Sequence, residues 1–377
     1  MIVKTPPMGW NSWNTFGGNI NEELIKTTAD TMADSGLLDA GYEYLVIDDC
    51  WALRERDENG RMVPDPAKFP NGMKAVADYV HSKGLKFGMY SCSGVLTCAG
   101  YPGSFDHEYI DADTFASWGV DFLKYDYCFR PSLSPGHLLY KKMGNALANC
   151  GRDILFSACS WGGHETHKWI KSTGAHMWRS TGDIVDSWAS IRDITRHQLE
   201  IWDYNGQGCF NDMDMLVVGM NGKGNVGVTG CTYEEYKSHF SIWAFLNSPL
   251  MIGCDIRNMS DETKSILTNR DIIAINQDPA ARQPYVIEPD AWHADSVLVL
   301  AKPLEGGDMA IGFFNLSDND SGPWFALDSI GLGSATGKAL EATELWTGEK
   351  VIKKDVFHIP RLAPHSCLVY RAKTIDA

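Results

Sequence analysis

The sequence of 377 residues predicts a (β/α)8 barrel of the TIM type, followed by a small antiparallel β-sandwich domain. One observation is that short apolar strands alternate with helical patterns from the N-terminus to about residue 280. Another is that this alternation stops after residues 276–279. From Ser296 onward, strands alternate with Gly-, Asp- and Pro-rich turns, and no convincing helix follows. We therefore expect a barrel at residues 1–282 and an antiparallel β-domain at residues 283–377.

The first part of the chain contains about eight βα units. The expected strands are residues 8–10, 44–47, 85–90, 120–123, 154–158, 175–178, 210–216 and 249–253. One expected helix has Met73, Val76, Ala77 and Val80 on its apolar face and ends at Gly84. A second helix carries Phe115 and Trp118 and is closed by Gly119. An open doubly wound sheet is the alternative, but it would require a glycine-rich phosphate turn where residues 11–13 read Asn-Ser-Trp.

The composition excludes several classes of protein. The net charge is −15, with 48 acidic and 33 basic residues, which disfavours a nucleic-acid partner. No apolar run approaches the roughly 18–20 residues that span a bilayer, so no membrane partner is expected. Residues 1–7 show no signal peptide, which leaves a cytoplasmic protein or a trimmed secreted form. The ten cysteines do not decide between a cytoplasmic and a secreted protein. The sequence also leaves open whether the protein forms a homo-oligomer.

Two carboxylates follow buried strands at the positions where a barrel collects catalytic groups. Asp126 comes just after the strand at 120–123, and Asp183 follows the strand at 175–178. We expect Asp126 to be a nucleophile, kept ionised by Lys124 on the same strand face. We expect Asp183 to be a general acid and base, with Arg179 orienting substrate hydroxyls. The structural alternatives are a surface Lys–Asp pair for Asp126 and a helix N-cap for Asp183.

Further carboxylates end two other expected strands. Asp48 and Asp49 are adjacent, and vicinal sugar hydroxyls are suitable hydrogen-bond donors for such a pair. Asp214 lies on the seventh strand. A metal is the competing interpretation, but the histidines lack zinc-like spacing and no calcium-loop pattern is present, so we expect no metal.

Six segments in order resemble glycoside hydrolase family 27, which contains α-galactosidases and α-N-acetylgalactosaminidases. They are residues 8–13, 48–51, 124–126, 178–183, 211–216 and 253–257. The resemblance implies a retaining exo-glycosidase that needs no cofactor and removes terminal α-D-galactosyl residues. The implied substrates are oligosaccharides or glycoconjugates that end in an α-galactoside.

The resemblance also implies individual roles. Asp126 would be the nucleophile and Asp183 the acid/base. The remaining matches would surround the sugar: Trp10 as an apolar wall, Asp48 and Asp49 at O4 and O6, Tyr90 in the lining, Lys124 at O3 and O4, Arg179 at O2, and Asp214 with Met215 on the far side. Cys98 and Cys128 match a disulfide of the family that would pack against C6 of the sugar.

The chain departs from the family pattern at its other cysteines. Cys50 lacks its usual partner, because Gly17 and Gly18 occupy that region. Cys92 replaces a frequent Asp on the neighbouring strand end, so a Cys50–Cys92 disulfide is an alternative that the spacing leaves open.

A second departure concerns the specificity for the sugar. Ser160 and Gly163 stand where galactose-specific members usually carry Glu and a large side chain, and Trp161 lies between them as a further expected substrate contact. The small residues would leave room for a 2-acetamido group, unless another loop fills the gap. Galactose and N-acetylgalactosamine therefore both stay open. A β-L-arabinopyranosidase and a non-catalytic sugar-binding protein are the weaker alternatives.

Overall fold

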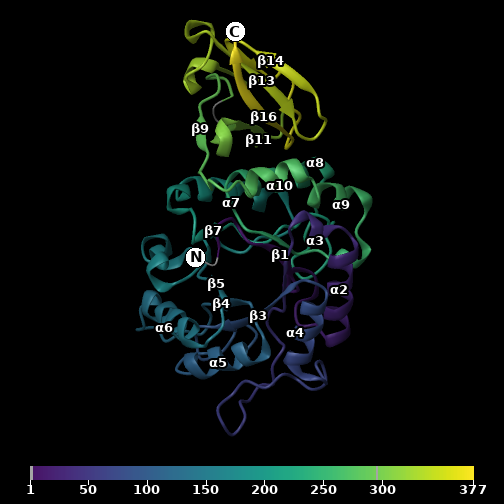
Figure 1. Ribbon diagram of the computed structural model, residues 1–377, viewed down its shortest axis with the longest axis vertical. Coiled ribbons are helices and arrows are strands. Elements are labelled where there is room, and N and C mark those ends of the chain that lie inside the picture. The colour runs from purple at the N-terminus through teal and green to yellow at the C-terminus, as the bar shows by residue number, and fades with distance from the viewer. Residues whose placement is uncertain (1–2, 294–295) are drawn as a thin grey trace.

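The computed structural model describes residues 3–293 and 296–377 and has the barrel and β-domain that the sequence predicts (Figure 1). Eight parallel strands form one sheet in the order β7-β6-β5-β4-β3-β2-β1-β8. Leu216, just after β7, forms a parallel bridge with Ile252 of β8. The Leu216 N–H donates to the Met251 carbonyl at 2.7 Å, and the Gly253 N–H donates to the Leu216 carbonyl at 3.0 Å. These bonds close the sheet into a barrel.

The barrel strands lie where the sequence predicts them, and almost all of their residues are buried, as expected for parallel strands covered by helices. Their bounds are β1 (Met8–Asn11), β2 (Tyr44–Val46), β3 (Lys86–Cys92), β4 (Phe122–Asp126), β5 (Leu155–Ala158), β6 (Met177–Arg179), β7 (Phe210–Asp212) and β8 (Leu250–Ile252).

The helices of the barrel have the apolar faces that their sequence patterns predict. Their bounds are α1 (Trp13–Phe16), α2 (Glu22–Asp34), α3 (Leu37–Ala40), α4 (Gly72–Ser82), α5 (Glu108–Trp118), α6 (Gly136–Asn149), α7 (Trp188–Leu199), α8 (Tyr233–Phe245), α9 (Asp261–Leu267) and α10 (Arg270–Asn276). The four predicted residues of the α4 face are all buried. Gly119 follows α5 with a φ of 84°, a left-handed conformation that suits glycine. Among the described residues, no helix combines the length and apolar composition that crossing a membrane requires.

The connection between β5 and β6 differs from the others. It contains only two 3₁₀ segments, Gly163–Lys168 and Ile170–Thr173. Trp161, His164 and Glu165 all have positive φ angles between 53° and 56°, which interrupt any regular α-helix here. This irregular segment lies at the end of the barrel where the candidate site is found.

The C-terminal part forms two antiparallel sheets around its own apolar core. One sheet has the order β14-β13-β16-β11-β10-β9, and β12 pairs with β15 in the other. The bounds are β9 (Tyr285–Ile287), β10 (Val297–Pro303), β11 (Met309–Asn315), β12 (Trp324–Ala326), β13 (Lys338–Glu344), β14 (Lys350–Lys353), β15 (Val356–His358) and β16 (Cys367–Asp376). Only 3₁₀ turns occur between the described strands from residue 296 onward, in agreement with the sequence analysis.

The β-domain packs beside α8 and α10, away from β3 and β4 (Figure 1). The Phe245 and Phe314 rings meet edge-on with centroids 5.6 Å apart. The buried Lys302 ammonium of β10 donates to Asn247 Oδ1 at 2.6 Å, which ties the two parts together. The boundary between residues 282 and 283 remains a prediction.

Candidate active site

A cavity of about 260 Å³ opens at the C-terminal ends of the barrel strands. It brings together most of the side chains that the sequence analysis singles out: Asp48, Asp49, Tyr90, Cys98, Lys124, Asp126, Cys128, Trp161, Arg179, Asp183, Asp214 and Met215. Its volume is slightly below the range typical of pockets for drug-sized ligands, which suits a single monosaccharide. A larger hollow of about 600 Å³ lies at the opposite end of the barrel, beside α6, and contains none of these residues.

Asp126 is the last residue of β4 and is buried at the floor of the cavity. Its Oδ1 accepts the Tyr127 N–H at 2.8 Å, and its Oδ2 accepts the Tyr90 hydroxyl at 3.1 Å. Burial raises the pKa of Asp126 to about 6, against the opposing effects of the Lys124 charge and the Tyr127 hydrogen bond. Lys124 favours the ionised form of Asp126, as the sequence predicts, but desolvation is the larger effect and sets the direction of the pKa shift.

Lys124 is paired with Asp48 rather than with Asp126. Its ammonium donates to Asp48 Oδ2 at 2.7 Å, and Asn11 Nδ2 donates to the same oxygen at 2.8 Å. Asp49 accepts the Ala99 N–H at 3.0 Å, so the two adjacent carboxylates have separate partners. Burial raises the pKa of Asp49. The alternative of a solvent-exposed Lys–Asp surface pair is wrong, since Asp48, Asp49 and Asp126 are all buried.

Asp183 lies at the mouth of the cavity and exposes 75% of its side chain. Arg179, at the end of β6, contacts Asp183 Oδ1 at 2.8 Å and Asp214 Oδ2 at 3.1 Å. Partial desolvation raises the pKa of Asp183, but the charge and hydrogen bond of Arg179 outweigh it and hold the pKa below its ordinary value. Arg179 therefore favours the ionised form of Asp183, whereas a general acid must be protonated when it donates.

The loop that carries Asp183 is fixed by contacts with distant segments. The Ile184 N–H donates to Asp214 Oδ2 at 2.8 Å. The fully buried Asp186 accepts the Gly222 N–H at 2.7 Å and the Tyr236 hydroxyl at 3.0 Å. Helix α7 is capped by Ser187, which accepts the Ser190 N–H, so the helix-cap alternative for Asp183 is wrong.

Three predicted residues do not reach the cavity wall. Trp10 is fully buried and its indole N–H donates to the Cys254 carbonyl at 2.8 Å, whereas Trp13 lines the cavity. Ser160 is buried, and its hydroxyl donates to Thr166 Oγ1 at 2.8 Å. Gly163 has no atom within 4 Å of the position that a Cβ would take. The space that the small residue leaves is therefore open, but the glycine itself lies outside the lining.

The sequence analysis missed five residues of the lining, namely Trp13, Asn14, Cys159, Ile184 and Val226. Trp13 stands in one of the quoted segments, so its residue type was a usable signal. Val226 lies in a long loop after β7, and its carbonyl accepts the Asp186 N–H at 3.0 Å. Only the folded loop brings this residue to the cavity.

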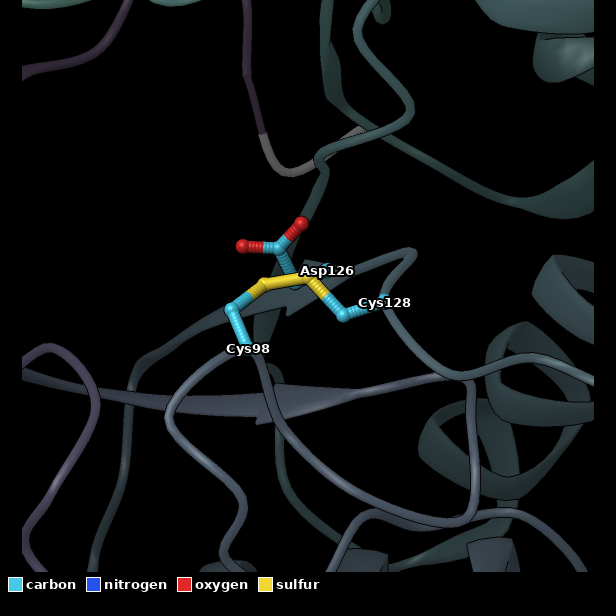
Figure 2. A group of neighbouring side chains, drawn as sticks. All are labelled: Cys98, Asp126 and Cys128. Atoms are coloured by element: carbon cyan, nitrogen blue, oxygen red, sulfur yellow. A yellow bond between two sulfur atoms is a disulfide. The ribbon is translucent and has the colours of Figure 1, made fainter.

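The disulfide that the family resemblance implies is present. Cys98 and Cys128 are bonded, with their Cα atoms 5.2 Å apart, and both residues lie beside the Asp126 carboxylate (Figure 2). The two sulfur atoms and the Asp126 carboxylate lie within 4.8 Å of one another. Since the sulfurs are joined to each other, this group offers no thiolate to a metal.

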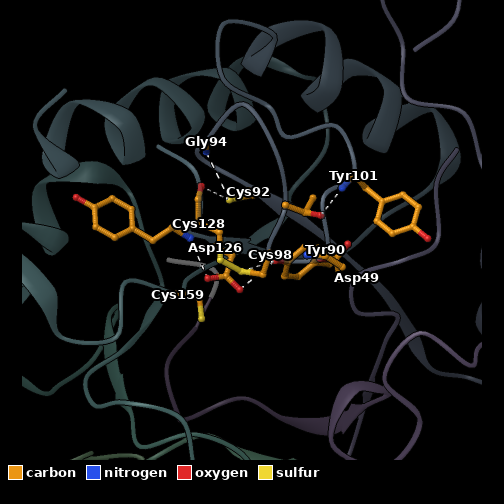
Figure 3. Close-up of a disulfide and its surroundings, with 12 residues drawn as sticks. Asp49, Tyr90, Cys92, Gly94, Cys98, Tyr101, Asp126, Cys128 and Cys159 are labelled. Carbon is orange, nitrogen blue, oxygen red and sulfur yellow. Dashed lines mark hydrogen bonds between the residues drawn. A yellow bond between two sulfur atoms is a disulfide. The ribbon is translucent and has the colours of Figure 1, made fainter. Parts of the chain in front are cut away.

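The alternative Cys50–Cys92 disulfide is wrong, because both residues are free thiols. The Cys92 thiol donates to the Cys128 carbonyl at 3.1 Å and accepts the Gly94 N–H at 3.5 Å (Figure 3). Burial raises the pKa of Cys50 to about 11, so this thiol stays protonated at neutral pH. A Cβ placed on Gly18 would lie 3.2 Å from the Cys50 sulfur.

Comparisons with known proteins agree with the fold. Residues 5–278 match the model of the "Alpha galactosidase A" family, and residues 294–372 match the "Alpha galactosidase C-terminal beta sandwich domain". Alpha-galactosidase 3 of Arabidopsis thaliana is 45% identical over 98% of this chain and 82% of its own length.

Solved structures give the same result. Alpha-galactosidase I of Mortierella vinacea is 33% identical, with a TM-score of 0.91 over all of this chain and 98% of its own. The Saccharomyces cerevisiae α-galactosidase with raffinose is 30% identical, with a TM-score of 0.86 over 99% and 98% of the two chains. These relatives share both domains with this chain.

Proposed function

We propose that this chain, which belongs to the α-galactosidase family of glycoside hydrolases (family 27), is a retaining α-galactosidase with Asp126 as nucleophile and Asp183 as acid/base. The observation that carries the proposal is the placement of both carboxylates in one monosaccharide-sized cavity, one at its floor and one at its mouth. A carboxylate on each side of the scissile bond is the arrangement that glycoside hydrolysis requires.

The first step forms a glycosyl-enzyme. An Asp126 oxygen attacks the anomeric carbon, the bond from that carbon to the leaving oxygen breaks, and Asp183 gives its proton to the leaving oxygen. In the second step, Asp183 takes a proton from water, the resulting hydroxide attacks the anomeric carbon, and Asp126 departs as a carboxylate. Two inversions leave the anomeric configuration unchanged. The chain's own residues perform both steps, so the proposal includes no cofactor.

The charged residues of the floor support a role in binding hydroxyls. The Lys124 ammonium has two further N–H donors besides the one that bonds Asp48. Asp48 and Asp49 offer carboxylate oxygens as acceptors in the same cavity. We place the O3, O4 and O6 hydroxyls of galactose against these three groups. Tyr90 and the Cys98–Cys128 disulfide complete the apolar lining around C6.

Arg179 supports a link between sugar binding and proton transfer. Its guanidinium is shared between Asp183 and Asp214. A sugar O2 hydroxyl that accepts a hydrogen bond from Arg179 would weaken its contact with Asp183. The pKa of Asp183 would then rise in the complex, because the group that lowers it has a new partner. Substrate binding thereby prepares Asp183 to donate its proton.

The substrates proposed for this chain are oligosaccharides and glycoconjugates with a terminal α-galactosyl residue. The raffinose present with the Saccharomyces cerevisiae α-galactosidase is an example of such a ligand on a relative. A second candidate sugar is α-N-acetylgalactosamine, because Ser160 and Gly163 are small residues at the positions that the family resemblance assigns to the O2 side of the sugar, although neither residue lines the cavity.

Paired assays test the proposal. We expect hydrolysis of aryl α-galactoside, with the α-anomer of galactose appearing first in NMR spectra, and weaker hydrolysis of aryl α-N-acetylgalactosaminide. A β-anomer as first product would contradict the two-step mechanism. Absence of N-acetylgalactosaminide cleavage at high enzyme concentration would leave plain α-galactosidase as the function.

A further inference from the structure

Two aromatic residues, in the loops after β4 and β5, combine an exposed ring with a left-handed backbone. Trp161 is 38% exposed with a φ of 55°, and Phe129 is 58% exposed with a φ of 45°. This region of backbone space is unfavourable for L-residues by roughly 1–2 kcal/mol. The Phe129 ring is mostly exposed and therefore gains little from burial to offset that cost. Backbone strain that packing does not explain concentrates at functional sites.

Trp161 lies next to the loop of the proposed acid. The Gly162 N–H donates to the Arg179 carbonyl at 3.0 Å, and a Cβ on Gly162 would lie only 2.5 Å from the Ser180 carbonyl oxygen. The segment around Trp161 therefore lies directly against the backbone that leads to Asp183. Trp161 is also part of the cavity lining, so its ring extends from the cavity to the solvent.

Phe129 lies in the loop after β4, the strand that carries the nucleophile. It follows Cys128, which lines the cavity, and its carbonyl accepts the Val95 N–H at 3.2 Å. Figure 3 shows Cys128 and its disulfide partner Cys98 beside Asp126.

The loops after β4 and β5 are joined to each other. The Trp161 and Tyr127 rings meet edge-on with centroids 6.1 Å apart. Arg130 covers the Tyr127 ring at 4.6 Å, and its Nη2 lies 2.8 Å from His164 Nε2. The segments that carry Phe129 and Trp161 are thereby held as one surface.

We propose that Trp161 and Phe129 form a platform for the aglycone, the group that is attached to the anomeric oxygen of the galactoside. This inference rests on the proposed function. The leaving oxygen must lie within hydrogen-bond reach of Asp183, so the aglycone leaves the cavity beside Trp161. Aromatic rings present flat apolar faces to their ligands, so the platform favours an aglycone with a flat apolar face of its own. An aryl ring and the C–H face of a second pyranose both have this property.

Glycine substitutions test the platform without adding backbone strain. Phe129→Gly and Trp161→Gly remove the rings and place glycine where φ is positive, which glycine adopts readily. For each variant, kcat/KM is measured on raffinose, on 4-nitrophenyl α-galactoside and on α-galactosyl fluoride, whose leaving atom is too small to reach the platform. We expect the ratio of kcat/KM on raffinose to kcat/KM on the fluoride to fall by about 10- to 50-fold in each variant, and the aryl ratio to fall with it.

The ratio does not depend on the active fraction of a preparation, so partial misfolding does not affect the result. Tyr109→Ala is the matched control, because Tyr109 is a comparably exposed aromatic residue on α5, outside the cavity, and its ratios should equal those of the wild type. Unchanged ratios in both glycine variants, or equal losses on all three substrates, would overturn the platform. Failure of the wild type to cleave any of the three substrates would overturn the proposed function instead.

Discussion

The two proposed catalytic carboxylates differ in how the fold holds them. Asp126 ends a barrel strand, is buried, and lies beside a disulfide that joins the loops after β3 and β4. Asp183 lies in a loop, exposes most of its side chain, and depends on Arg179 and on non-covalent contacts from the loop after β7. The nucleophile is thus fixed by its own strand, whereas the acid is placed by residues far away in the sequence. The placement of Asp126 should therefore depend mainly on residues close to it. The placement of Asp183 should also respond to substitutions at residues far from it in the sequence.

The largest effect is expected at the buried carboxylate. Asp126→Ala should lower kcat on aryl α-galactosides by roughly 10³-fold or more, because no other group can form the glycosyl-enzyme. Azide should partly restore turnover, since a small anion can enter the vacated space and attack the anomeric carbon. Circular dichroism checks that the variant is folded. A folded variant with near-normal turnover would remove Asp126 from its role.

The second prediction addresses the dependence of the acid on distant contacts. Asp186 is a positioning residue, because it joins the Asp183 loop to Gly222 and to Tyr236 of α8 without touching the cavity. Asp186→Asn should lower kcat by about 10-fold, with little change in KM. The loss should be larger for raffinose than for α-galactosyl fluoride, because only a poor leaving group requires protonation.

Asp193→Asn provides a matched control for the change at Asp186. Asp193 lies on α7 and its side chain is 70% exposed, so its substitution should leave both substrates unaffected. Equal losses on raffinose and fluoride in Asp186→Asn would show that Asp186 supports the fold and not the placement of the acid.

The sequence was most informative where neighbouring residues decide the structure. The barrel strands, the face of α4 and the Asp126 strand end were all predictable, because period and strand position are local properties. The choice between Trp10 and Trp13 was not predictable in this way. Trp10 lies on β1 and Trp13 begins α1, and only the hydrogen bond from Trp10 to the Cys254 carbonyl shows which of the two is removed from the cavity.

The ion-pair partners of the charged residues could not be predicted from the sequence either. Lys124 and Asp126 are close in sequence, but Lys124 pairs with Asp48, which follows β2, two strands away in the barrel. The pKa directions of Asp126 and Asp183 likewise depend on burial and on Arg179. Such effects require the tertiary structure, because desolvation is absent from a residue pattern.

The third prediction uses the raised pKa of Asp126. A carboxyl group with a pKa of about 6 in the folded state binds more protons than in the unfolded state, where its pKa is 3.8. Its contribution to stability is therefore complete below pH 4 and is lost as the pH rises to 6 and above. Asp126→Asn should remove that loss and raise stability at pH 7 by roughly 2 kcal/mol, or a Tm increase of a few degrees.

Thermal unfolding of Asp126→Asn and the wild type from pH 4 to pH 8 measures this effect. The difference in Tm should be smallest at pH 4 and should grow through pH 6. The wild-type kcat/KM should rise over the same interval, because the nucleophile must be ionised. A Tm difference that is independent of pH would show that Asp126 is not the titrating group.

The smallest effect is expected from a second, engineered disulfide. It would join the loops after β1 and β2, as the Cys98–Cys128 disulfide joins the loops after β3 and β4. A Cβ on Gly18 would lie 3.4 Å from Cys50 Cβ and 3.2 Å from its sulfur, close to the geometry of a disulfide. Gly18→Cys should therefore pair with Cys50 under oxidising conditions and raise stability by about 1 kcal/mol, below the usual 2–4 kcal/mol because the Cβ separation is slightly short. Thiol titration should show one pair of thiols lost on oxidation, and the gain in Tm should disappear with a reductant. Gly18→Ser, which cannot form the bond, is the matched control.

Because Asp183 is held by other segments, kcat should stay unchanged when the Gly18→Cys variant is oxidised. A fall in kcat on oxidation would show that the segment around Cys50 and the loop of Asp183 are mechanically coupled.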